Sequence, residues 1–210
     1  MHPETRDAIA AVDRATSAAD LVGAVRALAA RRDPEAIGPL MAALGYNNPG
    51  AAVAAVEGLV QLGEAAVQPM LDRLDGYNYT ARSWALRALS QIADPRALEI
   101  LLAAAETDFA PSVRRAAVKG LGFLRWERLD RPEAIAGQAR ALGVLEQCLG
   151  DVEWVVRYGA IVALENLAAT EGTAQPALRD RALDHLQRLA ETDPERALKL
   201  RSRLALERLA

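Results

Sequence analysis

Aromatic and basic residues gather around one expected helix start in the stretch DGYNYTARSWALRAL, residues 75–89. Tyr77, Tyr79 and Trp84 offer flat ring faces, and Arg82 adds a guanidinium group beside them. Aromatic rings stack on flat conjugated groups, and arginine binds carboxylates through charge-assisted hydrogen bonds. A packing helix does not need this combination, and the small residues at the positions equivalent to Trp84 in the other repeats leave room for a flat group beside its ring.

Two similar groups of aromatic and basic residues follow further along the chain. An arginine recurs 32 positions after Arg82 and again 43 positions later, each time near the expected start of a helix. The amino end of a helix carries partial positive charge, which favours anions. The residues predicted as ligand contacts are Tyr77, Tyr79, Arg82, Trp84, Phe109, Arg114, Arg115, Trp154, Arg157 and Tyr158.

The recurring arginines also have a purely structural interpretation. Asp75, Asp108 and Asp151 precede them by seven, six and six positions. An aspartate–arginine ladder of this kind ties successive helix starts together, and we prefer it to a ligand role for the three arginines. The loop aromatics can likewise fill grooves between helices. Arg115 and Tyr158 lie outside the ladder pattern and are therefore the stronger candidates for binding.

The residue types needed for several other chemistries are missing from the sequence. Its two histidines, His2 and His185, belong to no HExxH or His-Glu pattern, so a histidine-rich metal site is not expected. Neither a glycine-rich phosphate loop nor a GxSxG motif occurs. The single cysteine, Cys148, is in register with apolar neighbours, which predicts a buried residue and not a nucleophile.

The elements that must position these residues are repeated helix pairs. Segments beginning DPEAIGPLMAALGYNN at Asp33, EAAVQPMLDRLDGYNY at Glu64 and DPRALEILLAAAETDF at Asp94 align with one another. A fourth copy, ARALGVLEQCLGDVEWVVRYGAIVALENLAA, follows an insertion. Each copy holds two runs with apolar residues at helical spacing, and nothing alternates as a strand would. A period near thirty residues with two helices per unit predicts an all-α solenoid.

We predict one crescent-shaped domain, 1–210, with about twelve helices. Residues 33–169 form the four repeats, with the insertion near 127–138. Residues 1–32 are expected to form capping helices at the amino end. Residues 170–210 match the repeat poorly and are expected to be either capping helices or a partner-binding surface. Within the helix that follows Tyr79, the expected core face consists of Ala81, Ala85, Ala88, Leu89 and Ile92, with Trp84 at its margin.

Charge and composition exclude several classes of protein. The 25 Lys and Arg residues against 28 Asp and Glu residues give a net charge of −3, which argues against a nucleic-acid-binding protein. No apolar stretch is long enough to span a membrane, and the first residues do not resemble a signal peptide. With one cysteine and no possible internal disulfide, the chain is expected in a reducing compartment.

Four segments together suggest a family: LGYNNPGAAVAAVEGL, DGYNYTARSWALRAL, DPRALEILLAAAETDFAPSVRRAAVKGLGFLRW and VVRYGAIVALENL. They resemble the F-type subunits of cyanobacterial phycobilin lyases, in particular those of the phycocyanin α-subunit phycocyanobilin lyase, which have HEAT-like repeats. The resemblance implies a cytoplasmic protein of phycobilisome biogenesis that works as a heterodimer with an E-type subunit. It implies that phycocyanobilin is the substrate, that no cofactor is needed, and that the bilin is attached through a thioether to a cysteine of the phycocyanin α subunit.

A bilin fits the residues described above, since it is flat and conjugated and carries two propionates. Under this resemblance the rings would stack on the aromatic residues, and arginines would bind the propionates. Asp108 and Asp75 are the nearest candidates for a catalytic carboxylate that hydrogen-bonds the pyrrole nitrogens and favours the protonated, more electrophilic bilin. Two other functions stay open: a non-catalytic chaperone for bilin and phycobiliprotein, and a solenoid that binds only another protein.

Overall fold

The computed structural model describes residues 2–74, 79–170 and 176–210. It divides into two compact units, Met1–Ile92 (unit 1) and Ala93–Ala210 (unit 2). The described residues form twelve α-helices and no β-strand, which confirms the predicted all-α fold. The prediction of a single domain over residues 1–210 stays a prediction.

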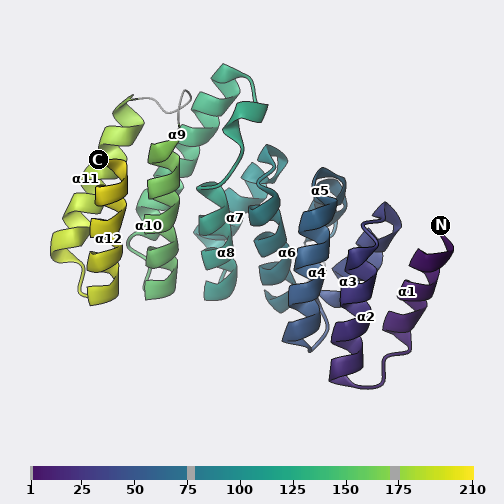
Figure 1. Ribbon diagram of the computed structural model, residues 1–210. Coiled ribbons are helices and arrows are strands. Elements are labelled where there is room, and N and C mark those ends of the chain that lie inside the picture. The colour runs from purple at the N-terminus through teal and green to yellow at the C-terminus, as the bar shows by residue number, and fades with distance from the viewer. Residues whose placement is uncertain (1, 75–78, 171–175) are drawn as a thin grey trace. The chain divides into compact units, whose positions relative to one another are not determined.

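Unit 1 consists of three helix pairs. Within each pair the two helices pack together, and the second helices also pack side by side, α2 on α4 and α4 on α6 (Figure 1). This arrangement buries the apolar stripe that each helix cannot bury alone. The helices are α1 (Pro3–Asp13), α2 (Ala18–Ala30), α3 (Ile37–Ala43), α4 (Pro49–Leu62), α5 (Glu64–Leu71) and α6 (Tyr79–Ile92).

Unit 2 repeats this plan, and each of its last four helices has at least 14 residues. Its second helices again form a row, with α8 packed on α10 and α10 on α12 (Figure 1). The last pair therefore packs on the pair before it in the same manner as the recognised repeats. The helices are α7 (Leu98–Thr107), α8 (Pro111–Leu121), α9 (Arg131–Cys148), α10 (Trp154–Ala169), α11 (Pro176–Thr192) and α12 (Arg196–Leu209).

Aspartate residues cap the N-termini of several of these elements. The Asp33 carboxylate accepts a hydrogen bond from the backbone N–H of Glu35 at 3.0 Å, and Asp94 accepts one from Arg96 at 3.0 Å. In both places a proline follows and begins a short 3-10 turn that leads into the helix, η1 (Pro34–Ala36) before α3 and η3 (Pro95–Ala97) before α7.

Small residues let the rows of helices approach closely. A Cβ atom added at Gly58 on α4 would lie 2.7 Å from the Cβ of Ala29 on α2. One added at Gly122, directly after α8, would lie 2.4 Å from the Cα of Ala163 on α10. Real Cβ atoms do not pack at such distances, so these positions require glycine.

The core face predicted for α6 is confirmed. Trp84 is half-buried at the margin of that face, as expected. The residues predicted for the core, Ala81, Ala85, Ala88, Leu89 and Ile92, are all buried.

The predicted insertion near 127–138 lengthens one element and leaves the packing of helix pairs intact. It includes most of a short 3-10 turn, η4 (Trp126–Arg128), and the first residues of α9. Trp126 is 1% exposed, and a Cβ atom at Gly137 would lie 2.7 Å from its ring. The extra residues thus form a turn anchored by a buried tryptophan.

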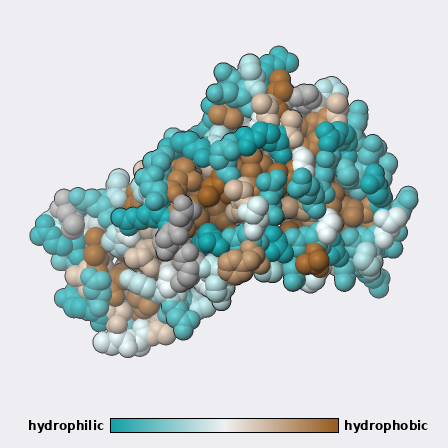
Figure 2. All heavy atoms as spheres, turned by 180° about the vertical axis from the view of Figure 1, so that it is seen from behind, coloured by the Kyte–Doolittle hydropathy of each residue, from teal (hydrophilic) through white to brown (hydrophobic). Residues whose placement is uncertain are grey.

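Figure 2 shows one face of the molecule, on which hydrophobic residues are visible between hydrophilic ones. Several large apolar side chains are among the exposed residues of the described chain. They include Phe109, Phe123, Val152, Trp154, Leu200 and Leu204.

Candidate functional site

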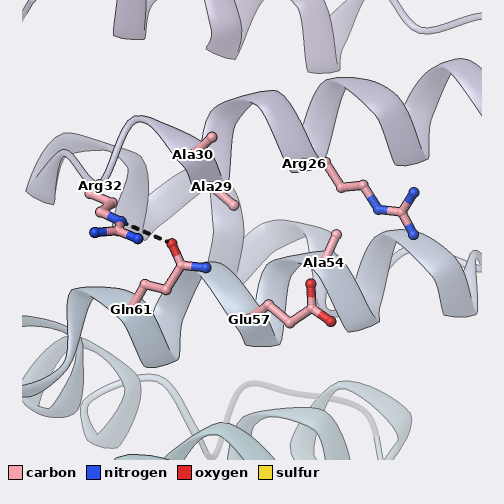
Figure 3. Close-up of a pocket in the computed structure, with 7 residues that line it drawn as sticks. All are labelled: Arg26, Ala29, Ala30, Arg32, Ala54, Glu57 and Gln61. Atoms are coloured by element: carbon pink, nitrogen blue, oxygen red, sulfur yellow. Dashed lines mark hydrogen bonds between the residues drawn. The ribbon is translucent and has the colours of Figure 1, made fainter.

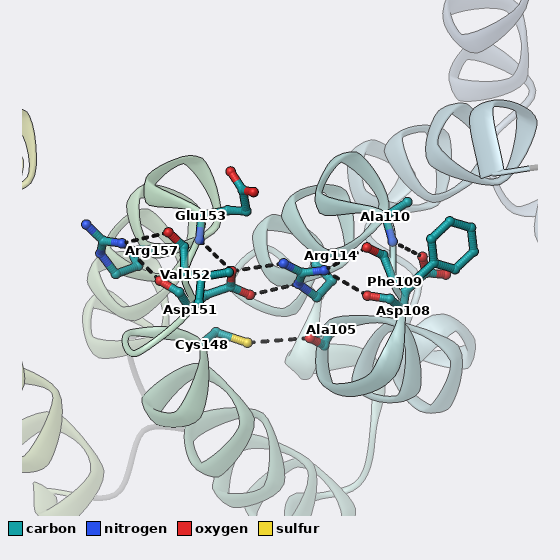
Figure 4. Close-up of polar contacts among 10 residues, drawn as sticks. All are labelled: Ala105, Asp108, Phe109, Ala110, Arg114, Cys148, Asp151, Val152, Glu153 and Arg157. Carbon is teal, nitrogen blue, oxygen red and sulfur yellow. Dashed lines mark hydrogen bonds and ion pairs between the residues drawn. The ribbon is translucent and has the colours of Figure 1, made fainter.

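The predicted aspartate–arginine ladder is present in unit 2, where it ties one helix pair to the next (Figure 4). Arg114 binds the Asp151 carboxylate with two hydrogen bonds, Nε to Oδ2 at 2.7 Å and Nη2 to Oδ1 at 2.9 Å. Its Nη1 donates to the carbonyl oxygens of Asp108 at 2.9 Å and Phe109 at 3.2 Å. Arg114 therefore joins the turn before its own helix to the turn of the following pair.

Arg157 repeats these contacts one helix pair later. Its Nη1 donates to the carbonyl oxygens of Asp151 at 2.9 Å and Val152 at 3.4 Å, and its Nε lies 3.5 Å from Asp193 Oδ2. Asp193 belongs to the segment that matched the repeat poorly. The ladder thus continues into the turn between α11 and α12, which the sequence did not reveal.

Hydrogen bonding and charge determine the protonation of this ladder. Burial alone would raise the pKa of Asp151. Hydrogen bonds from Arg114 and from the Glu153 backbone lower it, as do the charges of Arg114 and Arg157, and these effects together exceed that of burial. The pKa of Asp151 therefore lies below its ordinary value. The pKa of Arg114 is raised, chiefly by its hydrogen bond to Asp151. These contacts support the structural interpretation of Arg114 and Arg157, whose role as bilin contacts stays a prediction.

Of the two candidate catalytic carboxylates, Asp75 lies outside the described residues, as does Tyr77. Asp108 is half-buried and accepts a hydrogen bond from the backbone N–H of Ala110 at 2.9 Å. It thus caps the turn that leads into α8. Its role as a catalytic carboxylate stays a prediction.

A face of unit 2 brings together the strongest sequence candidates on the neighbouring helices α8 and α10. Trp154 and Tyr158 lie one turn apart on α10, 48% and 38% exposed, with ring centroids 6.5 Å apart at an interplanar angle of 87°. Arg115 is exposed on α8, and Lys119 follows one turn later on the same side. We call Arg115, Lys119, Trp154 and Tyr158 the cationic–aromatic face.

The two helices of this face are in van der Waals contact beside Arg115 and Lys119. A Cβ atom at Gly159 on α10 would lie 3.7 Å from both the carbonyl oxygen of Arg115 and the Cγ of Lys119. Within the described chain, neither Arg115 nor Lys119 is paired with a carboxylate. Their charges are therefore available to an anionic ligand. Lys119 was missed at the sequence level, although its spacing of four residues from Arg115 was visible there.

Phe109 lies in the turn before α8 and is 76% exposed, with its ring pointing away from the ladder (Figure 4). A phenylalanine that filled a groove would be buried, so the exposed Phe109 ring does not fill a groove within unit 2. This observation argues against the groove-filling alternative at this one position.

The predicted contacts in unit 1 that the structure describes lie on α6. Tyr79 is 54% exposed at the start of the helix, and Arg82 is half-buried. The guanidinium carbon of Arg87 lies 5.3 Å from the centroid of the Trp84 ring, which is a cation–π distance. Arg87, which the sequence reasoning did not select, therefore adds a positive charge beside the Trp84 ring.

Unit 1 also has a polar pocket. None of the predicted ligand contacts within the described ranges lines it. It lies between α2 and α4, has a volume of about 340 Å³, and is lined partly by alanines from both helices. Arg32 Nε donates to Gln61 Oε1 at 3.2 Å at one end, and Arg26 lies at the other (Figure 3). The lining residues are Arg26, Ala29, Ala30, Arg32, Ala54, Glu57 and Gln61.

Cys148 is buried, as predicted, with its Sγ 3.7 Å from the carbonyl oxygen of Ala105. Burial raises the pKa of the thiol to about 11, so it is protonated at neutral pH and unsuited to nucleophilic attack. In the part of the chain that the structure describes, no cluster of His, Cys, Asp or Glu could hold a metal ion. None of the helices described is long and apolar enough to cross a membrane.

Comparison with known proteins relates this geometry to a family. Residues 67–165 match the family described as HEAT repeats, and residues 21–46 match the PBS lyase HEAT-like repeat. The phycocyanin alpha phycocyanobilin lyase CpcF of Synechocystis sp. is 55% identical over 193 residues, covering 92% of this chain and 88% of that protein. A phycobilisome maturation protein of Synechococcus elongatus is 52% identical, with 96% of both chains covered.

A solved structure agrees with these relatives. The complex of CpcE and CpcF of phycocyanin lyase from Nostoc sp. contains a chain that is 47% identical to this one. The two superpose with a TM-score of 0.77, over 82% of this chain and 99% of that one. The chain therefore belongs to the phycocyanobilin lyase family of HEAT-repeat proteins, as an F-type subunit.

Proposed function

We propose that this chain is the F subunit of a heterodimeric bilin lyase, active only with an E-type partner. Together the two subunits bind phycocyanobilin and attach it through a thioether to a cysteine of the phycocyanin α subunit. The observation that carries this proposal is the 55% identity to a phycocyanin alpha phycocyanobilin lyase over 92% of the chain. The reaction belongs to phycobilisome biogenesis, and we place it in the cytoplasm.

The cationic–aromatic face supplies what such a substrate requires. Trp154 and Tyr158 present exposed ring area to the conjugated system of the bilin, and Arg115 and Lys119 present unpaired charge to its propionates. Holding the bilin in one orientation makes attack by the incoming thiol effectively intramolecular, which accounts for rate enhancement without a nucleophile in the lyase. Within unit 1, Tyr79, Arg82 and Trp84 on α6 are proposed separately as bilin contacts.

The chemistry needs no resident cofactor, since phycocyanobilin is the substrate. A thioether forms when the acceptor thiol adds to a carbon–carbon double bond of the bilin: the S–C bond forms and the sulfur proton moves to the bilin. We propose Asp108 as the carboxylate that hydrogen-bonds the pyrrole nitrogens and keeps the bilin protonated during attack. Asp75 is proposed for the same role.

The proposal is tested with four components: this chain, an E-type subunit, phycocyanobilin and apo-phycocyanin α subunit. After incubation and denaturation, zinc-enhanced fluorescence on the α-subunit band measures covalent attachment. We expect labelling only when both lyase subunits are present. We also expect the product, before denaturation, to have the absorption spectrum of native phycocyanin. Labelling at the same rate, with the same product, when this chain is left out would instead identify it as a chaperone or a protein-binding scaffold.

A further inference from the structure

A buried ion pair lies between α10 and α12, next to the cationic–aromatic face. Arg201 on α12 is 8% exposed, and its Nη2 donates to the carboxylate of Glu165 on α10, which is 9% exposed. Arg208 Nη1 lies 3.3 Å from the other carboxylate oxygen of Glu165. The charge of Arg201 is thus neutralised inside the protein.

The guanidinium of Arg201 is incompletely satisfied. Its Nη1 is buried and has no hydrogen-bond acceptor among the described residues. A buried donor without an acceptor costs free energy, and a buried ion pair is often no more stable than apolar residues of similar volume. Stability alone therefore does not account for an arginine at this position.

The ring of Tyr158 supplies a second contact for this guanidinium. The Cζ of Arg201 lies 6.0 Å from the ring centroid, within cation–π range. The edge-to-face contact with Trp154 is a second restraint on the same ring. Tyr158 nevertheless stays 38% exposed, so part of the ring remains accessible to a ligand.

We propose that Arg201 is a positioning residue for bilin binding, which acts by holding the Tyr158 ring in its stacking orientation. The inference rests on the proposed function, because it assumes that Tyr158 contacts the bilin. A ring that is already fixed loses less conformational entropy when a flat ligand stacks on it. Arg201 thereby contributes to affinity without touching the substrate.

The test is a double-mutant cycle between Arg201 and Tyr158 in the complete heterodimer with the E-type subunit. Phycocyanobilin is titrated into each heterodimer, and affinity is read from the bilin absorption band. We expect Arg201→Gln to weaken binding about tenfold and to shift the band, because the ring loses its cation–π contact. In a Tyr158→Leu background the same substitution should change neither affinity nor spectrum, whereas Tyr158→Phe should preserve the effect.

Two controls keep the outcome decisive. If Arg201→Gln unfolds the subunit, by circular dichroism, the variant E165Q/R201M removes both buried charges and is expected to give the same loss of affinity. Equal losses from Arg201→Gln with and without Tyr158 would overturn the inference, because the arginine would then act on the fold as a whole. Failure of the unaltered heterodimer to bind phycocyanobilin would instead refute the proposed function.

Discussion

At the scale of single residues, the difference between paired and unpaired charge separates binding candidates from structural residues. The guanidinium of Arg114 donates hydrogen bonds to Asp151 and to two backbone carbonyls. Arg115, its neighbour in sequence, has no carboxylate partner in the described chain. In the sequence, Arg114 belongs to the ladder pattern and Arg115 lies outside it, and the contacts give the physical reason. The contact of Arg201 with Tyr158 was not predictable, since no motif or repeat in the sequence pairs these two residues.

Arg115→Gln should weaken bilin binding about fivefold, the effect of losing one partly exposed ion pair. The propionates supply the charge, so the loss should vanish when the dimethyl ester of phycocyanobilin replaces the free acid. Absorption titration of the heterodimer measures both affinities. Arg131→Gln, the same change at an exposed position on α9, is the matched control and should bind as the unaltered protein does. An equal loss for acid and ester would contradict carboxylate recognition.

Cys148 should be nearly inert towards iodoacetamide in the folded protein. Its pKa of about 11 leaves about a hundredfold less thiolate at pH 8 than the ordinary value of 9.0 would. Because burial raises the pKa, the alkylation rate should still rise about tenfold per unit between pH 8 and 10. Mass spectrometry of quenched samples gives the rate, with the urea-unfolded chain as the reactive reference. Alkylation as fast in the folded chain would show that the thiol is accessible.

At the scale of helix pairs, the ladder holds successive turns of unit 2 together through partly buried charges. The Arg114 and Asp151 side chains are 14% and 11% exposed, whereas those of the pair Arg140 and Glu99 are 52% and 72% exposed. Since water weakens exposed pairs, the two should differ greatly in their contribution to stability.

Asp151→Asn should lower the free energy of unfolding by about 3 kcal/mol, because Arg114 would keep its charge without its partner. Glu99→Gln, which breaks the exposed pair, should change it by less than about 1 kcal/mol. Urea denaturation followed by circular dichroism measures both. Similar losses in the two variants would mean that burial does not decide the strength of these pairs.

The contribution of Asp151 should also depend on pH. Its pKa is depressed in the folded state, so its stabilisation is complete above the unfolded value of about 4 and is lost as the pH falls through the folded pKa. The stability difference between the unaltered chain and Asp151→Asn should therefore shrink below about pH 4. Urea midpoints at pH 7, 5, 4 and 3 would reveal this, and a constant difference would count against it.

At the scale of the whole chain, the thirty-residue period predicted the helix pairs and their order, because apolar spacing is a local signal. The last pair escaped recognition since its apolar positions are interleaved with Arg and Asp. Its turn, with Asp193 followed by Pro194, also resembles the start of a repeat such as Asp33. An aspartate cap suits any helix start, so the motif does not reveal which turn it occupies.

Deleting residues 171–210 distinguishes a cap from a partner surface. The helices α11 and α12 pack on α10 and bury Leu186, Leu198 and Ala205. We therefore expect the shortened chain to expose apolar surface and to lose several degrees of melting temperature before any partner is added. Differential scanning fluorimetry measures this, and gel filtration with the E-type subunit measures binding. An unchanged melting temperature with lost binding would identify a partner surface alone.

The ladder has a consequence for how such a chain can change in length. Six positions separate Asp108 from Arg114 and Asp151 from Arg157, and one residue more or fewer would rotate the arginine away from the carbonyls that it binds. The insertion near 127–138 lies instead between helix pairs, where α9 simply becomes longer. Residues can therefore be added or removed between two helix pairs at little cost in stability, whereas the turn inside a pair has a fixed length.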